Sequence, residues 1–140
     1  MITNNPEQTK ALAKQFMEGL VPGHGTTIIE LLGDLGAGKT TFMHGVGEYF
    51  GFTKPLASPT FVIGKHYDLP EGFPWKRLIH IDAYRIESAK ELSGIGWHTY
   101  ASDKSNIIFV EWPSNLETDI HATKRIIFKH INENQRDIEI

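Results

Sequence analysis

The sequence predicts an α/β fold with a three-layer core, a mainly parallel central sheet and a C-terminal antiparallel hairpin. The apolar run at 28–32 leads into a glycine-rich loop and then into a helical segment, which is the usual order in a parallel sheet. Strand and helix patterns continue to alternate along the rest of the chain. The tail contains two alternating apolar segments on either side of a polar turn at 132–134, and this arrangement predicts the hairpin.

The glycine-rich loop, Gly33–Thr40, matches the pattern G-x-x-x-x-G-K-[ST] of phosphate-binding loops. Its glycines allow successive backbone N–H groups to point at one anion, and the following helix adds partial positive charge there. Lys39 can then reach the β- and γ-phosphates of a nucleotide, and the Thr40 hydroxyl can bind Mg²⁺. The strand–loop–helix setting favours this mechanism over a glycine-rich surface turn. We therefore expect a core of the P-loop NTPase type, and ATP as its nucleotide because no Asn-Lys-x-Asp run selects guanine.

The other elements follow from apolar periodicity and from the turn residues between them. The first helix begins near Pro6, and its apolar stripe of Leu12, Phe16 and Leu20 recurs every four residues. The apolar run at 107–110 is typical of a central parallel strand, which is buried on both faces. The predicted helices cover 6–20 and 39–50, and one or two short helices, broken at Gly94 and Gly96, are predicted over 88–101. The predicted strands cover 28–32, 61–67, 76–83, 107–110, 125–129 and 136–140.

Composition limits the classes of function. The 140 residues have a formal net charge of −3 and a pI near 6.1, which disfavours tight direct binding of nucleic acid through its phosphates. Cysteine is absent, so disulfide and thiolate chemistry are excluded, and this fits a cytoplasmic protein. No apolar run approaches the roughly 18 residues of a membrane span, so we expect no membrane association. The chain is predicted to be a single P-loop ATPase domain over residues 1–140.

Two acids follow predicted strands, where a phosphate-binding loop needs a carboxylate for Mg²⁺ or its water shell. Glu111 follows the apolar run 107–110, and Asp82 ends the segment 78–81. We expect one to act on the metal and the other to position the attacking water, and the sequence leaves open which does which. His80 shares a strand face with Asp82, and we interpret it as a buried, hydrogen-bonded histidine rather than a metal ligand.

A serine-proline turn lies about twenty residues after the loop, in a segment without periodicity. Ser58 and Thr60 are candidates for a nucleotide-sensing switch, because the Thr60 hydroxyl could approach the γ-phosphate or Mg²⁺. An ordinary turn at the start of a strand explains the same residues equally well.

Four motifs taken together resemble the TsaE family: Gly-Asp-Leu-Gly-Ala-Gly-Lys-Thr-Thr at 33–41, Ser-Pro-Thr-Phe at 58–61, His-Ile-Asp-Ala-Tyr-Arg at 80–85 and Val-Glu-Trp-Pro at 110–113. The resemblance implies a bacterial ATPase of tRNA N6-threonylcarbamoyladenosine biosynthesis. Such a subunit works with the TsaD and TsaB proteins and meets tRNA only indirectly, through the complex. It implies a Mg²⁺-dependent ATPase that is weak alone and stimulated by its partners.

The resemblance also implies roles for single residues, in addition to the catalytic trio of Lys39, Asp82 and Glu111. Phosphates would be held by Lys39 and the turn Gly36-Ala37-Gly38, and Mg²⁺ by Thr40 and Glu111, with Asp82 near the metal and water. The nucleotide's other parts would lie near Thr41 (α-phosphate), Thr9 (base) and Arg136 (nucleoside). The chain departs from the family pattern at Gly96-Trp97-His98 and at Ser114, outside the phosphate chemistry.

Two alternative functions stay open from the residues alone. A small-molecule kinase of the P-loop class needs a lid that brings arginines to the transferred phosphate. The sequence offers only single, scattered arginines: Arg77, Arg85, Arg125 and Arg136. A nucleotide-gated binding module with little hydrolysis would share the loop and differ in turnover.

Overall fold

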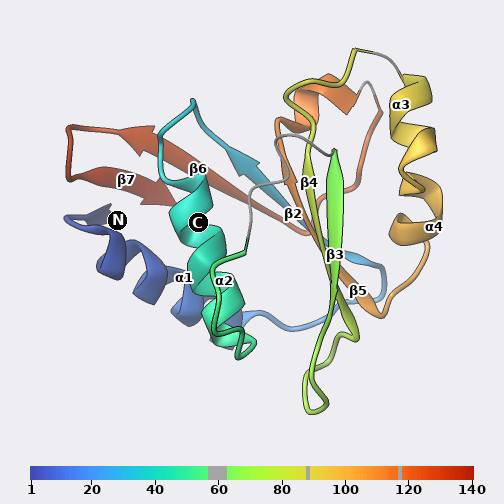
Figure 1. The fold of residues 1–140 in the computed structure, drawn as a ribbon, viewed down its shortest axis with the longest axis horizontal. Coiled ribbons are helices and arrows are strands. Elements are labelled where there is room, and N and C mark those ends of the chain that lie inside the picture. The colour runs from blue at the N-terminus through green and yellow to red at the C-terminus, as the bar shows by residue number, and fades with distance from the viewer. Residues whose placement is uncertain (57–62, 88, 117) are drawn as a thin grey trace. The chain divides into compact units, whose positions relative to one another are not determined.

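The computed structural model describes residues 1–56, 63–87, 89–116 and 118–140 (Figure 1). Contacts within the chain define two compact units. The first unit comprises Met1–Val21, Leu32–Ala57 and Ile126–Ile140, and the second comprises Pro22–Leu31 and Ser58–Arg125. Each unit therefore joins segments that lie far apart in the sequence. The expectation of a single domain over residues 1–140 stays a prediction.

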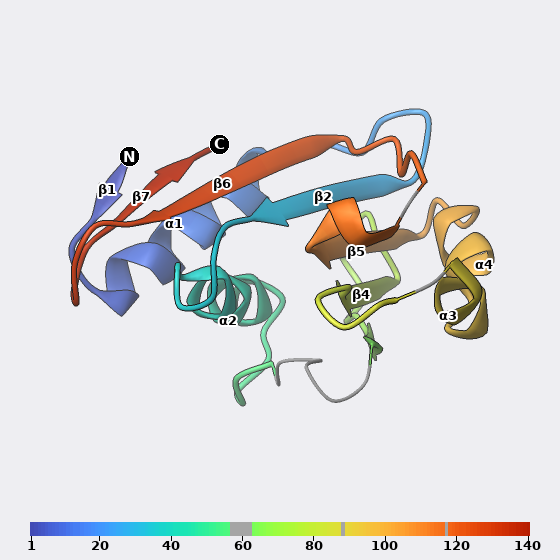
Figure 2. The ribbon, with the colours of Figure 1, turned by 90° about the horizontal axis from the view of Figure 1, so that it is seen from above.

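The first unit contains two packed helices, α1 (Pro6–Gly19) and α2 (Lys39–Tyr49). They lie side by side in Figures 1 and 2, and α2 approaches α1 closely at Gly45. A Cβ added to Gly45 would lie 2.6 Å from the carbonyl oxygen of Lys10, so a larger residue would push the helices apart. The small residue at position 45 therefore sets the spacing of α1 and α2.

The start of α1 follows directly from its sequence. The side chain of Asn5 accepts a hydrogen bond of 2.8 Å from the backbone N–H of Gln8, which is the usual N-cap contact. Pro6 occupies the first turn, where its missing N–H costs nothing. Leu12 and Met17 are buried, as expected for an apolar stripe. The first helix is thus placed by local signals.

Three antiparallel strands complete the first unit, in the order β1 (Ile2–Thr3), β7 (Arg136–Glu139) and β6 (Lys124–His130). The β6–β7 pair is the C-terminal hairpin that the sequence predicts. Strand β1 was not predicted, because two residues are too short to show periodicity. It is held at the edge of β7, where the N–H of Ile138 donates to the carbonyl oxygen of Met1 at 2.8 Å.

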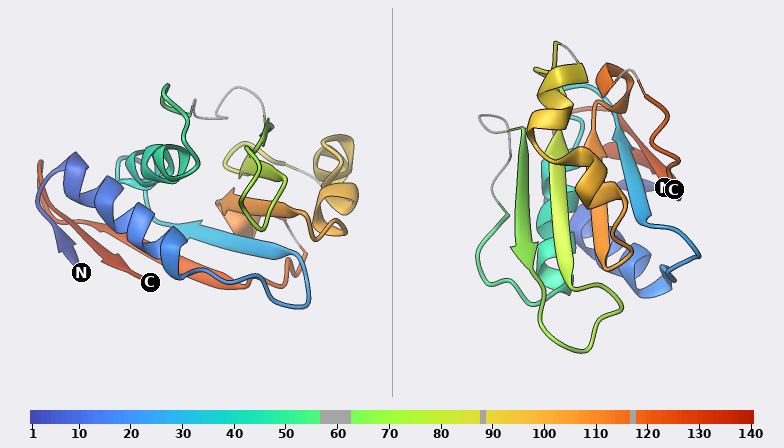
Figure 3. Two further views of the ribbon diagram at one scale, coloured as in Figure 1. Left: turned by 90° about the horizontal axis from the view of Figure 1, so that it is seen from below. Right: turned by 90° about the vertical axis from the view of Figure 1, so that its right-hand side faces the viewer.

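Four strands of the second unit follow the order β2 (Thr27–Leu32), β5 (Asn106–Glu111), β4 (Arg77–Asp82) and β3 (Gly64–Asp68). Both β2 and β4 pair with β5 in parallel, whereas β3 pairs with β4 in an antiparallel direction (Figure 3, right). Every residue of β5 is buried, as its apolar sequence predicts for a central parallel strand. These strands and helices confirm a mixed α/β fold.

Two short helices, α3 (Ala89–Gly94) and α4 (Trp97–Ala101), and the 3₁₀ turn η1 (Pro113–Leu116) belong to the second unit. Trp97 from α4 and Leu116 from η1 enter an apolar core formed with the strands. Its strand residues are Ile28, Ile79, Ile81, Ile108 and Val110. Gly96 is the N-cap of α4 and has a φ of 82°, and α3 ends at Gly94, so the break between the two helices falls at the predicted glycines.

The helices at 6–20 and 39–50 and the strands at 28–32, 76–83 and 107–110 are confirmed within a few residues. The predicted strand 61–67 begins outside the described residues, and its described part is β3. The three-layer stacking stays a prediction. Among the described residues, no helix has both the length and the apolar character to cross a membrane.

Candidate nucleotide site

The loop between β2 and α2 is shaped by three glycines. Gly33, Gly36 and Gly38 have φ angles of 151°, 78° and 109°, which residues with a side chain rarely adopt. At Gly33 the space is also closed, since an added Cβ would lie 2.6 Å from the carbonyl oxygen of Phe128. The backbone path of this loop therefore depends on glycine.

Helix α2 begins at this loop without a side-chain cap. Its N-cap, Gly38, is left-handed and makes no side-chain hydrogen bond, and the N–H of Phe42 donates to the Gly38 carbonyl oxygen at 3.0 Å. The N–H groups that precede this bond, such as those of Thr40 and Thr41, have no acceptor inside the helix. Such groups, together with the helix dipole, attract an anion. The start of α2 thus has the geometry of a phosphate-binding site.

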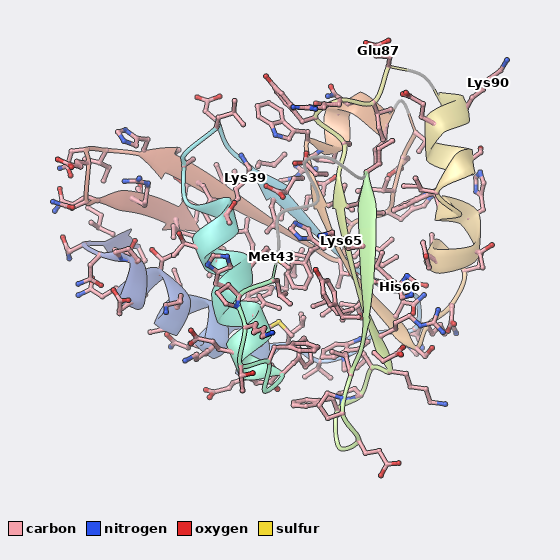
Figure 4. All side chains as sticks on the ribbon, in the orientation of Figure 1. Lys39, Met43, Lys65, His66, Glu87 and Lys90 are labelled. Atoms are coloured by element: carbon pink, nitrogen blue, oxygen red, sulfur yellow. The ribbon has the colours of Figure 1, made fainter. Side chains whose placement is uncertain are left out.

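Lys39 lies in the first turn of α2 (Figure 4). Its ammonium group donates to the carbonyl oxygen of Gly33 and, at 3.0 Å, to that of Asp34, and the residue is only 6% exposed. The charged group is therefore held inside the loop, close to the N–H groups that begin the helix. This position suits an ammonium that exchanges backbone oxygens for phosphate oxygens when a nucleotide binds.

Arg136, at the start of β7, contacts the same loop. Its Nε donates to the carbonyl oxygen of Gly36 at 3.2 Å, and its Nη1 donates to those of Asn132 at 2.7 Å and Gln135 at 2.9 Å. The guanidinium group therefore links the β6–β7 turn to the phosphate-binding loop. The predicted contact of Arg136 with the nucleoside stays a prediction.

Thr9 lies on the buried side of α1, where its hydroxyl is 2.8 Å from that of Thr3. This pair joins α1 to β1, and its predicted place beside the nucleotide base stays a prediction. The predicted switch residues Ser58 and Thr60 lie outside the described residues.

The two predicted acids stand at the ends of neighbouring parallel strands in the second unit. Asp82 ends β4, Glu111 ends β5, and the two residues are register partners. Asp82 Oδ1 accepts a hydrogen bond of 3.0 Å from the N–H of Tyr84, which fixes its carboxylate at the strand end. Each acid therefore ends a strand, as the sequence predicts, and the parallel pairing makes the two residues neighbours in the sheet. The loop residues belong to the first unit.

Glu111 also has a buried partner. His80 Nε2 lies 2.8 Å from Glu111 Oε2, and the two residues are 2% and 5% exposed. The interpretation of His80 as a buried, hydrogen-bonded histidine is confirmed. The sequence did not identify its partner, although parallel pairing of β4 with β5 would place the two residues on one face.

The chemistry of these oxygen donors fits Mg²⁺. Magnesium is bound in proteins by one or two carboxylates, with water and substrate phosphates completing its shell. The chain offers the hydroxyl of Thr40 and the carboxylates of Asp82 and Glu111. Within the described ranges, no group of three or more histidine, cysteine or acidic side chains is arranged as a metal site of its own. A metal at the strand ends of Asp82 and Glu111 would therefore need further oxygen ligands, such as water or phosphate.

A model of the family described as "Threonylcarbamoyl adenosine biosynthesis protein TsaE" matches residues 3–138. The chain belongs to the TsaE family. The resemblance carried by the four sequence motifs is thereby confirmed, and the family acts in tRNA threonylcarbamoyladenosine biosynthesis.

Individual relatives agree with the family match. A tRNA threonylcarbamoyladenosine biosynthesis protein TsaE of Bacillus subtilis is 36% identical over 97% of this chain and 80% of its own length. One of Rickettsia felis is 35% identical over 80% of this chain and 61% of its own length. A crystal structure of YdiB from Bacillus subtilis matches with a TM-score of 0.68 and 32% identity, covering 99% of this chain and 80% of that one.

Proposed function

We propose that this chain is the ATP-binding and ATP-hydrolysing subunit of tRNA N6-threonylcarbamoyladenosine biosynthesis, acting with TsaD and TsaB. The proposal is carried by the loop Gly33–Thr40, whose positive φ angles, uncapped helix start and enclosed lysine together suit a nucleotide phosphate chain. Membership of the TsaE family supplies the process in which the nucleotide is used. The glycine-rich loop that leads directly into α2 supports a core of the P-loop NTPase type.

Each residue has a definite role in this proposal. The turn Gly36-Ala37-Gly38 and Lys39 bind the phosphates, and Thr40 and Glu111 hold Mg²⁺. Asp82 orients the attacking water. The proton of this water leaves for solvent or for the phosphate. When bound, Mg²⁺ neutralises charge on the β- and γ-phosphates. Thr41 contacts the α-phosphate.

The contacts of Arg125 and Arg136 favour hydrolysis of ATP over transfer of its γ-phosphoryl group to a small metabolite. A kinase lid needs arginines that can reach the transferred phosphate, but Arg125 is paired with Glu30 at 2.6 Å. Arg136 is already engaged by backbone carbonyl oxygens of its own turn and of the loop. The net charge of −3 favours indirect contact with tRNA, through the partner proteins.

Phosphate release from ATP tests the proposal, measured for the chain alone and with TsaD and TsaB. We expect slow release alone, an increase with both partners, and near-complete loss in Lys39→Ala. Lys54→Ala is the matched control, because Lys54 is an exposed lysine outside the loop.

The outcomes separate the three candidate functions. Rapid release that the partners do not alter would contradict the role in the complex. Nucleotide binding without phosphate release, even with the partners, would indicate a nucleotide-gated module. Transfer of labelled γ-phosphate to a metabolite pool would indicate a kinase.

A further inference from the structure

His80 and Glu111 form a buried pair at the strand ends of the second unit. They come from neighbouring parallel strands, and His80 lies two residues before Asp82 on the same face of β4. The 2.8 Å contact joins His80 Nε2 to Glu111 Oε2, and both side chains are almost fully buried. The His80 imidazole therefore contacts the Glu111 carboxylate, which we propose as a ligand of Mg²⁺.

The surroundings of His80 decide which ring nitrogen carries the proton. Its Nδ1 is buried and has no hydrogen-bond partner among the described residues. A proton on Nδ1 would be buried without an acceptor, whereas a proton on Nε2 points at a carboxylate oxygen. The ring thus donates its Nε2–H to Glu111 Oε2, and this bond does not occupy Oε1.

We propose that His80 is a positioning residue that holds the Glu111 carboxylate in one orientation and leaves its Oε1 available to Mg²⁺. The inference rests on the function proposed above. A buried carboxylate has several rotamers, and a hydrogen bond to one oxygen selects the orientation of the other. Partners of metal ligands act in this way, and their loss typically weakens metal binding about 10- to 100-fold.

Two substitutions of His80 distinguish a role in orienting Glu111 from a role that only fills space in the core. His80→Leu keeps an apolar side chain of similar size but removes the donor. His80→Gln keeps an amide N–H donor at a comparable reach. Thr27→Val is the matched control, because it removes a buried hydroxyl that accepts from Trp75 Nε1 at 3.1 Å elsewhere in the same unit.

The measurement is ADP affinity by calorimetry, first in EDTA and then across a Mg²⁺ titration. We expect His80→Leu to raise the half-effective Mg²⁺ concentration at least about tenfold while leaving affinity in EDTA unchanged. His80→Gln should recover most of the wild-type midpoint, and Thr27→Val should match wild type. Equal midpoints in wild type and His80→Leu, or equal shifts in the Leu and Gln variants, would overturn the inference.

A measurement on the wild-type chain covers the case in which His80→Leu does not fold. In protein with ¹⁵N-labelled histidine, Mg²⁺ added to the ADP complex should shift the His80 Nε2 signal, because metal on Glu111 weakens the accepting oxygen. An unchanged signal would reject the positioning role even if ADP binds. Absence of ADP binding by the wild-type chain would instead reject the proposed function itself.

Discussion

The phosphate-binding loop of the first unit and the strand ends of the second unit are built in opposite ways. The loop works through backbone: its shape comes from glycine φ angles, and its donors are the N–H groups that begin α2. The strand ends work through side chains, namely Asp82, Glu111 and the histidine behind Glu111. The shape of the first suits an anion, whereas the second presents negative charge of its own.

This difference predicts different sensitivity to substitution. Within the loop, Leu35 is 69% exposed, so its side chain is free to vary, while the glycines are not. At the strand ends the backbone is ordinary β-structure, and the proposed chemistry depends on the identity of each side chain. Changes of backbone freedom should therefore damage the loop, and isosteric changes of charge should damage the strand ends.

Among the substitutions that test this contrast, Glu111→Gln is expected to have the largest effect. The amide keeps the size of the side chain but removes the charge, so phosphate release should fall about 10²- to 10³-fold. Affinity for ADP in EDTA should stay within a few-fold of wild type, because the loop supplies that binding. Asp119→Asn is a control at an exposed acid. If Glu111→Gln also lost ADP affinity in EDTA to a similar degree, the proposed division of roles between the loop and the strand ends would be wrong.

Gly33→Ala should have the next largest effect, on both stability and binding. Its Cβ would collide with the Phe128 carbonyl oxygen at a φ of 151°, which costs about 2–4 kcal/mol in free energy of unfolding. Chemical denaturation of the variant measures this loss, and ADP calorimetry measures the binding. Gly25→Ala is the control, since an added Cβ there meets nothing within 4 Å. Equal stability of both variants would show that the loop adapts.

The same contrast explains what the sequence could predict. The loop was predictable because its glycines and Lys39 are contiguous, so a local pattern carries the geometry. Asp82 and Glu111 were predictable as strand ends from the apolar runs before them. Their pairing, and the contact of His80 with Glu111, depends on β4 lying beside β5, a long-range choice that local periodicity does not encode.

Arg136 was named from the sequence, but its backbone contacts could not be predicted. They depend on the path of the β6–β7 turn and on its packing against the loop. Strand β1 and the turn η1 were missed because each is too short to show a period. Tertiary contacts rather than local preference place these three features.

A smaller effect is expected for Arg136, which tests whether the loop relies on charge or on position. Arg136→Ala should lower the free energy of unfolding by about 1 kcal/mol and weaken ADP binding several-fold, because the turn and the loop lose their common donor. Arg136→Lys keeps the charge but not the forked donors, so it should resemble Ala. Affinity restored by Lys would instead indicate direct attraction of phosphate.

The smallest effect is expected for Glu48→Gln, at an exposed ion pair between α1 and α2. Lys14, at 2.6 Å, and then Lys10, at 3.0 Å, hold the pKa of Glu48 below its ordinary value of 4.5 through hydrogen bonds. The pairing therefore stabilises the fold above pH 4.5, and this contribution is lost as the pH falls through the lowered pKa.

Thermal unfolding of wild type and Glu48→Gln between pH 7 and pH 3 tests this sign. We expect a small deficit in the midpoint of the variant at pH 7 that narrows below pH 4.5, because exposed pairs are weakened by solvent. Glu133→Gln, at an exposed position in the β6–β7 turn, is the control for removal of an exposed carboxylate. Gly45→Ala, at the close approach of α1 and α2, is the comparison. If Glu48→Gln lowers the unfolding midpoint more than Gly45→Ala does, the surface charges rather than the close packing at Gly45 hold α2 against α1 and support the loop.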